Sequence, residues 1–312
     1  MLGEVVSIVG KDIIVEAKIN NKLTEVNCVQ TGTIISHSKY SNLVVTGDIV
    51  HFRYEEGLSK IIKVEDRRTK FSRVSPSNKN REQIIAANIN TLLIFVSVLE
   101  PKFNTRFIDR YLVAARINKI DPIICVNKTD LTTKKIVKKL IQPYIKLGID
   151  VHCISVLESI GIKKLKNKIM NRKTVVSGMS GAGKSSFLNS ILGYDAQIVK
   201  KINERTNKGT HTTSFAKRYR IKDNKLRDKG WIIDSPGVRE FGIWDLTKEE
   251  VGVIFPDFEN YYLQCKYTSC THTHEPDCAV INAVENGEID EERYNSYLNI
   301  YDTLKDENES WK

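Results

Sequence analysis

The first 73 residues contain short runs in which apolar and polar positions alternate. The runs are Val5–Val9, Asp12–Val15, Leu43–Val45, Asp48–Phe52 and Lys60–Val64, with glycines between them. Alternation with a period of two predicts strands with one buried face, and the glycines predict turns. Five short strands predict an OB-type β-barrel over residues 1–73. The open face of such a barrel commonly binds nucleic acid, although a purely structural barrel fits the same pattern.

The pattern changes after a polar stretch at Phe71–Arg81, which we expect to be a linker. Expected strands at 91–98, 123–126, 151–155, 174–177 and 231–233 alternate with expected helices at 103–118, 132–147, 162–171 and 184–192. Such alternation predicts an α/β unit, with a largely parallel sheet covered by helices on both faces. We expect this unit to span residues 74–243 and a mostly helical unit to span residues 244–312.

Composition excludes a membrane-spanning protein. The 312 residues are 41% hydrophobic, and no apolar run approaches the roughly 20 residues that a spanning helix needs. The start, Met1-Leu2-Gly3-Glu4, lacks the basic residues and apolar stretch of a secretory signal. We therefore expect a cytoplasmic protein with no membrane partner. We also expect it to act as a monomer.

The net charge of +10 is unevenly distributed. Residues 131–175 carry eleven basic and two acidic side chains, and residues 199–230 carry eleven and three. Residues 285–312 carry three basic and nine acidic side chains, which is typical of a solvated acidic helix and tail. The basic stretches indicate a polyanionic partner such as RNA, the alternative being ordinary polar helix faces in a lysine-rich chain.

A phosphate-binding loop follows the expected strand 174–177 and opens the expected helix 184–192. The eight residues Gly178, Met179, Ser180, Gly181, Ala182, Gly183, Lys184 and Ser185 match the P-loop pattern, and we expect the following Ser186 to bind the nucleotide as well. Backbone N–H groups can surround a β-phosphate here because glycines place no Cβ in the way. Lys184 would reach the β- and γ-oxygens, and the Ser185 hydroxyl would bind Mg²⁺.

A second phosphate element, Asp234-Ser235-Pro236-Gly237, comes directly after an apolar strand. Open sheets of this kind bind ligands at the carboxyl ends of their strands. Asp234 would hold Mg²⁺ through water, and the Gly237 N–H would sense a γ-phosphate. Alone, Asp-x-x-Gly is a common turn, but together with the upstream phosphate loop it indicates a nucleotide switch.

The string Asn127-Lys128-Thr129-Asp130 indicates guanine recognition. The Asp130 carboxylate can accept from guanine N1–H and the exocyclic amine, and leaving a buried partner unpaired costs roughly 1–3 kcal/mol. Asn127 would tie loop and base together, the Lys128 stem would cover the ring, and Ser155 would supply a backbone contact to the guanine oxygen. The alternative is a plain turn with Asp130 as a helix cap, which the phosphate loop disfavours.

Three cysteines and a histidine within residues 265–278 predict a structural zinc site. Cys265, Cys270, His272 and Cys278 offer three thiolates and an imidazole, a ligand set that leaves no open position for catalysis. His274 competes with His272 on spacing alone. Buried unligated thiols are the alternative, but the flanking residues are polar.

The order of these elements is reversed relative to most GTPases, because the guanine-reading residues 127–156 precede the phosphate-binding residues 178–237. Cutting a closed fold at one surface loop and joining it at another permits such an order. The chain resembles the RsgA/YjeQ family of circularly permuted GTPases over essentially its whole length. The matching pieces are the barrel, Asn127–Asp130, Gly178–Ser186, Gly209–Thr213, Asp234–Phe241 and the cysteine cluster.

The resemblance implies GTP hydrolysis stimulated by the small ribosomal subunit, as a switch in late maturation of that subunit. It also implies that the barrel and a zinc domain with one Zn²⁺ per chain grip ribosomal RNA, and it favours His272 as the zinc ligand. Thr213, or its neighbour Thr212, would bind the Mg²⁺ that accompanies GTP.

The resemblance further makes His211 the candidate for positioning the attacking water, because Val238 stands where many GTPases have a water-orienting glutamine. A solvated loop histidine is the alternative for His211. Two other functions stay open: an RNA-binding module in which nucleotide is mainly structural, and a P-loop ATPase or kinase, which Asn127–Asp130 disfavours.

Overall fold

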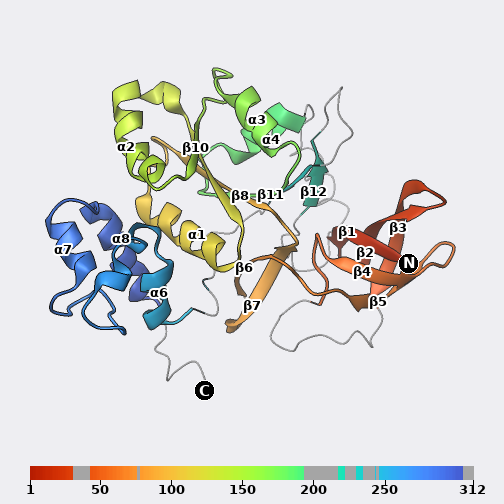
Figure 1. Cartoon of the computed structure of the whole chain (residues 1–312). Helices are drawn as coiled ribbons and strands as arrows, with labels where there is room; N and C mark the ends of the chain where they lie inside the picture. Colours follow the sequence, from red (N-terminus) through yellow and green to blue (C-terminus); the bar gives the residue numbers. More distant parts are fainter. Residues whose placement is uncertain are drawn as a thin grey trace.

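The computed structural model describes residues 1–30, 43–75, 78–192, 217–221, 230–234, 243 and 246–304. Within these residues a barrel lies on one side of a central sheet and a group of C-terminal helices lies on the other (Figure 1). No described helix combines the length and the apolar character needed to cross a bilayer.

The N-terminal barrel closes in the order β1-β2-β3-β5-β4. Its strands are β1 (Leu2–Val9), β2 (Asp12–Ile19), β3 (Lys22–Gln30), β4 (Ile49–Arg53) and β5 (Ser59–Val64). The alternate residues that point inward, such as Val5, Val15, Phe52 and Ile61, are fully buried. Closure of five short strands is the OB-type architecture expected from the alternation.

One predicted barrel strand was wrong. Leu43–Val45 is not a strand; Val44 and Val45 are buried, and the Val45 N–H donates to a carboxylate oxygen of Asp48 at 2.8 Å. The third strand is β3 instead, whose first four residues are exposed. Its sequence therefore lacks the apolar alternation that predicts a strand.

The predicted linker at Phe71–Arg81 was also wrong. Strands β6 (Lys70–Ser75) and β7 (Asn78–Ala87) form an antiparallel hairpin. A polar cross-strand pair, Lys70 with Glu82 at 2.8 Å, helps to hold it, so the polar composition marks strands rather than a linker. Phe71 is fully buried in the core beneath the central sheet, and the boundary expected at residue 73 falls within β6.

The central sheet has the order β10-β9-β8-β11-β13-β12. Its strands are β8 (Thr91–Ser97), β9 (Asp121–Asn127), β10 (Asp150–Cys153), β11 (Lys173–Gly178), β12 (Lys217–Arg220) and β13 (Trp231–Asp234). All neighbours are parallel except β12 and β13. Strand β12 was not expected, because three of its four residues are basic.

Helices cover both faces of this sheet, as expected (Figure 1). Helices α1 (Thr105–Ile117) and α2 (Lys134–Lys146) pack on one core cluster, and α3 (Ile162–Ile169) and α4 (Lys184–Leu192) on the other. Side chains of Asn104 and Thr133 cap the starts of α1 and α2. The carboxyl ends of β8, β9, β11 and β13 therefore meet at one edge, and this edge carries the candidate site.

The C-terminal helices pack against α1. They are α6 (Lys248–Ile254), two 3₁₀ turns η2 (Pro256–Phe258) and η3 (Tyr262–Gln264), α7 (Ala279–Glu285) and α8 (Glu291–Tyr301). The Arg293 guanidinium of α8 is 1% exposed and donates to Asp109 of α1, which is fully buried. Helix α8 is acidic in its first turn, but its inner face is thus part of a buried ionic contact.

Candidate nucleotide-binding site and metal centre

Three positions of the phosphate loop favour glycine because of close approach or backbone conformation. At Gly178 a Cβ would lie 2.0 Å from the Phe95 carbonyl oxygen of the adjacent strand. Gly181 and Gly183 have φ angles of +80° and +94°, a region that other residues rarely adopt. The Lys184 ammonium donates to the carbonyl oxygens of Gly178 at 2.5 Å and Met179 at 2.8 Å, so it lies inside the loop where phosphate oxygens would replace those acceptors.

Asn127 joins the guanine-reading segment to the phosphate loop. Its side chain is 2% exposed, and its amide nitrogen donates to the Ala182 carbonyl oxygen at 2.8 Å. Its amide oxygen accepts from the Val156 N–H at 3.1 Å. One buried side chain at the end of β9 therefore contacts two other loops at the carboxyl edge of the sheet.

The rest of this segment is held by backbone contacts. Lys128 has a left-handed φ of 60°, and its ammonium donates to the Glu100 carbonyl oxygen. Thr129 donates to the Ile154 carbonyl oxygen from its N–H at 3.2 Å and its hydroxyl at 3.0 Å. Asp130 is exposed in a 3₁₀ turn, η1 (Thr129–Leu131), and the cap of α2 is Thr133, so Asp130 does not serve as that cap.

Ser155 is buried in the neighbouring loop. Its hydroxyl accepts from the Glu158 N–H at 3.1 Å, and its own N–H donates to the Ile160 carbonyl oxygen at 3.1 Å. A contact between the Ser155 N–H and a guanine oxygen would therefore exchange one hydrogen bond for another.

Sequence reasoning missed the loop between β8 and α1. Glu100 accepts from Lys128, and a Cβ on Gly181 would lie 3.6 Å from the Pro101 ring. The Ser97 hydroxyl donates to the Pro101 carbonyl oxygen at 2.6 Å. The available signal was the end of an apolar strand at Ser97, since β8 ends at the same edge as Asn127 and Gly178.

Asp234 ends β13 at this same edge. It is half-buried and pairs with Val176 of β11 and Lys217 of β12. Ser185 is half-buried and Ser186 is exposed in the first turn of α4. His211, Thr212, Thr213, Gly237 and Val238 lie outside the described residues.

The predicted metal ligands converge in the C-terminal helices. One ligand atom from each of Cys265, Cys270, His272 and Cys278 lies within 4.8 Å of all the others. The Nδ1 of His272 is 3.5 Å from the Cys265 sulfur and 3.4 Å from the Cys278 sulfur. The donor set and its spacing fit one tetrahedral cation.

The electrostatics of this cluster also fit a cation. Burial raises the pKa of the Cys270 thiol to about 12, and burial raises the pKa of Cys278. Burial lowers the pKa of His272, which keeps its imidazole neutral. A divalent cation would supply the positive charge that buried thiolates need.

The loop that presents His272 is itself tightly bonded. The Glu275 carboxylate accepts from the N–H groups of Thr271 at 2.6 Å, Thr273 at 3.0 Å and His274 at 3.2 Å. Tyr294 of α8 donates to the His272 carbonyl oxygen at 2.7 Å. The exposed His274 contacts the Thr273 hydroxyl at 2.7 Å and stands outside the cluster, so the structure brings His272 to the thiols.

Known proteins are similar to this chain over nearly its whole length. A family model described as RsgA GTPase matches residues 64–244. The small ribosomal subunit biogenesis GTPase RsgA of Chlorobaculum parvum is 35% identical, and the alignment covers 97% of each chain. The protein of that name from Chlorobaculum tepidum is 36% identical, with 97% of each chain covered.

Two solved structures share the fold. YjeQ from Thermotoga maritima is 28% identical, with a TM-score of 0.74 and 96% of each chain covered. YloQ, described as a circularly permuted GTPase, is 25% identical, with a TM-score of 0.71 and coverage of 96% of this chain and 93% of that one. The fold class expected from the sequence, a circularly permuted GTPase behind an N-terminal barrel, is confirmed.

Proposed function

The chain belongs to the RsgA family of GTPases, and on that premise we propose that it binds the small ribosomal subunit and hydrolyses GTP as a switch in late maturation of that subunit. The observation that carries this proposal is the hydrogen bond from Asn127 to Ala182. It holds a guanine-reading segment against a phosphate loop that comes later in the chain, which is the contact that a permuted GTPase requires.

The phosphate-binding residues at the carboxyl edge of the sheet have separate roles in this reaction. The phosphate loop would bind the β-phosphate, and Lys184 would exchange its carbonyl acceptors for β- and γ-oxygens. Ser185 and Thr213, or Thr212 in its place, would bind Mg²⁺ directly, and Asp234 would bind it through water. The Mg²⁺ would neutralise charge on the phosphates as the γ-phosphoryl leaves.

Guanine would be selected by the Asp130 carboxylate, which is exposed and free to reach a base at the edge of the sheet. Gly237 would sense the γ-phosphate. His211 would position the attacking water, since Val238 has no group that can do so. We therefore expect slow intrinsic hydrolysis and strong acceleration by the small subunit.

The barrel and the C-terminal unit are proposed to contact ribosomal RNA, the latter with one Zn²⁺ bound by Cys265, Cys270, His272 and Cys278. The zinc would be structural, because four protein ligands complete its coordination. We propose a monomer that acts in the cytoplasm, with the three units expected from the sequence, except that the first boundary lies before β6 rather than at residue 73. The hairpin β6–β7 is best counted with the GTPase unit, because Phe71 is in the core of that unit.

Single-turnover hydrolysis with and without purified small subunits tests this function. A switch GTPase should hydrolyse GTP much faster with subunits present, whereas an RNA-binding module with a structural nucleotide would show the same rate in both conditions. Competition among GTP, ATP and xanthosine triphosphate tests the base. Asp130→Asn should reduce the preference for GTP over xanthosine triphosphate, and an unchanged preference would contradict the guanine assignment.

A further inference from the structure

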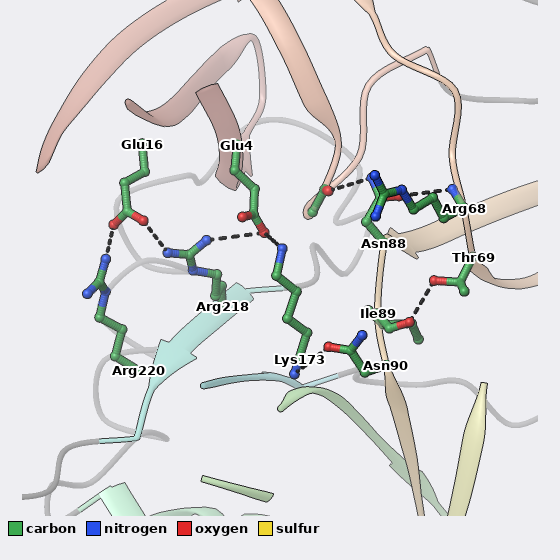
Figure 2. A network of polar contacts seen from close by, with 11 residues as sticks. Glu4, Glu16, Arg68, Thr69, Asn88, Ile89, Asn90, Lys173, Arg218 and Arg220 are labelled. Carbon is green, nitrogen blue, oxygen red and sulfur yellow. Dashed lines mark hydrogen bonds and ion pairs between the residues drawn. The ribbon is translucent and has the colours of Figure 1, made fainter. Parts of the chain in front are cut away.

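A cluster of five charged side chains joins the barrel to the edge of the central sheet (Figure 2). Glu4 of β1 accepts from Lys173 of β11 at 2.9 Å and lies 3.5 Å from the guanidinium of Arg218 of β12. Glu16 of β2 accepts from Arg218 at 2.9 Å and also from Arg220 of β12. Two barrel carboxylates are thus interleaved with three basic side chains of the sheet.

The centre of the cluster is too buried to be an ordinary surface ion pair, whereas Lys173 and Arg220 at its margins are 28% and 37% exposed. The Arg218 side chain is 3% exposed, and those of Glu16 and Glu4 are 14% and 20% exposed. The Arg218 guanidinium also lies 5.2 Å from the ring centre of Trp231 in β13. Removing one carboxylate would leave the buried Arg218 guanidinium with only one carboxylate to balance three basic side chains, which is more disruptive than breaking an exposed pair.

Strand β12, which carries both arginines of the cluster, also lies next to the proposed phosphate site. Strand β12 is at the end of the sheet order and pairs with β13, so that Lys217 is opposite Asp234 and Arg220 is opposite Trp231. The barrel therefore contacts the strand that lies beside Asp234, one of the proposed Mg²⁺ ligands.

We propose that Glu4 and Glu16 are positioning residues for GTP hydrolysis on the small subunit. Through Arg218 they hold β12 against β13, where Lys217 is opposite Asp234, the residue proposed to bind Mg²⁺ through water. Ribosomal RNA that immobilises the barrel would therefore also restrain β12 through these ionic contacts. This inference rests on the proposed function, and it assigns the two carboxylates to the coupling between subunit binding and hydrolysis rather than to nucleotide binding.

Neutral, isosteric variants test the coupling in the full-length protein. Glu16→Gln and Glu4→Gln are compared with Glu55→Gln, a barrel residue in an exposed pair with Lys60 at 3.3 Å. The measurements are the intrinsic single-turnover rate, the rate at saturating small subunits, and the Kd values for GTP and for subunits. Glu16→Gln should lose about tenfold of the subunit-stimulated rate, with the intrinsic rate and the Kd for GTP unchanged, and Glu55→Gln should match the wild type.

A compensating variant separates positioning from a general structural defect. Glu16→Gln combined with Arg220→Gln removes one acid and one base, which returns the cluster to its original net charge. It should recover part of the stimulated rate. If Glu16→Gln does not fold, Glu4→Gln carries the test, because it leaves the contacts of Glu16 with both arginines in place.

Three results would overturn the inference: full stimulation in both glutamine variants, an equal loss in Glu55→Gln, or a parallel fall of the intrinsic rate, the stimulated rate and GTP affinity. The first two would show that the cluster does not carry the coupling, and the third would show that it only maintains the fold. A wild-type protein that subunits do not accelerate would instead remove the proposed function itself, and the inference with it.

Discussion

A single buried amide, that of Asn127, connects three loops that come from different parts of the chain. It donates to Ala182 in the phosphate loop and accepts from Val156 beyond β10. Neither aspartate nor alanine can do both, because a carboxylate has no donor and a methyl group has neither function. The residue therefore shapes the site before any nucleotide arrives.

Replacing Asn127 with alanine should weaken nucleotide binding. The half-buried Val156 N–H would lose its acceptor, at a cost of about 1–3 kcal/mol, and the Kd for GDP should rise by about tenfold or more. Fluorescence titration with labelled GDP measures this change. Glu158→Gln is the control, because only its backbone is bonded within the same loop; equal affinity in both variants would contradict the linking role of Asn127.

Glu275 has a comparable role beside the metal centre. Burial by itself would raise the pKa of Glu275, but hydrogen bonds from Thr271 and from backbone N–H groups outweigh this and lower it from 4.5 to about 2. A depressed carboxylate pKa means that the stabilisation is complete above about pH 4.5 and is lost as the pH falls toward 2. At neutral pH the carboxylate therefore holds the His272 loop at full strength.

Glu275→Gln should release the metal faster, because a neutral amide is a weaker acceptor for the same N–H groups. Zinc transfer to a chromogenic chelator at pH 7 measures the rate. We expect a severalfold faster transfer, within the range seen when groups that support metal ligands are changed. The exposed Glu285→Gln is the control, and indistinguishable rates in the two variants would show that Glu275 does not support the site.

At the scale of elements, the contact between α1 and α8 combines an apolar cluster, which includes Val113 and Tyr297, with one buried charge cluster. The Arg293 guanidinium donates to Asp109 of α1, and its Nε lies 3.2 Å from both carboxylate oxygens of Asp257. Arg116 of α1 makes a second ion pair with Glu259 at 2.8 Å, but both of these side chains are well exposed. The same pair of units is thus joined by one buried and one exposed ionic contact.

These two contacts should differ in their effect on stability. Arg293→Met leaves the fully buried Asp109 without its partner and should cost about 3–5 kcal/mol. Arg116→Gln should cost less than about 1 kcal/mol, because solvent screens an exposed pair. Urea unfolding of both variants measures the difference, and equal losses would mean that burial of Arg293 contributes nothing at this interface.

Elements were predictable from the sequence where local signals are strong. Helix α4 begins at Lys184 and ends at Leu192, as the phosphate-loop pattern and apolar spacing predict. Strands β3, β6 and β12 were missed because their residues are largely polar and lack the apolar alternation that predicts a strand. The contacts of Lys128 with Glu100 and of Arg293 with Asp109 could not be predicted, since only the folded topology brings these residues together.

At the scale of the whole molecule, the barrel and the GTPase unit have separate cores despite their ionic contact. Phe52 is fully buried in the barrel core, and Phe71 is fully buried in a core of the central sheet. The two residues are the same type and equally buried, but they belong to different clusters. They therefore allow a matched comparison between the units.

Phe71→Ala should destabilise the GTPase unit by about 3–5 kcal/mol and reduce GDP affinity. Phe52→Ala should disrupt the barrel by a similar amount while GDP binding persists. Thermal unfolding with and without GDP measures both effects, because a ligand stabilises the unit that binds it. Full retention of GDP affinity in Phe71→Ala would contradict the assignment of the hairpin β6–β7 to the GTPase unit, and loss of GDP binding in Phe52→Ala would contradict the separation of the two cores.

The barrel and the C-terminal helices lie on opposite sides of the sheet, so the GTPase unit separates the two proposed RNA-binding units (Figure 1). If both ends hold RNA, attachment of one end raises the effective concentration of the other, and the combined affinity exceeds that of either end. Such avidity depends on the distance and angle between the two RNA-binding units as much as on their contacts. A small rotation of one unit relative to the sheet would then weaken binding to the small subunit while each contact surface stays intact.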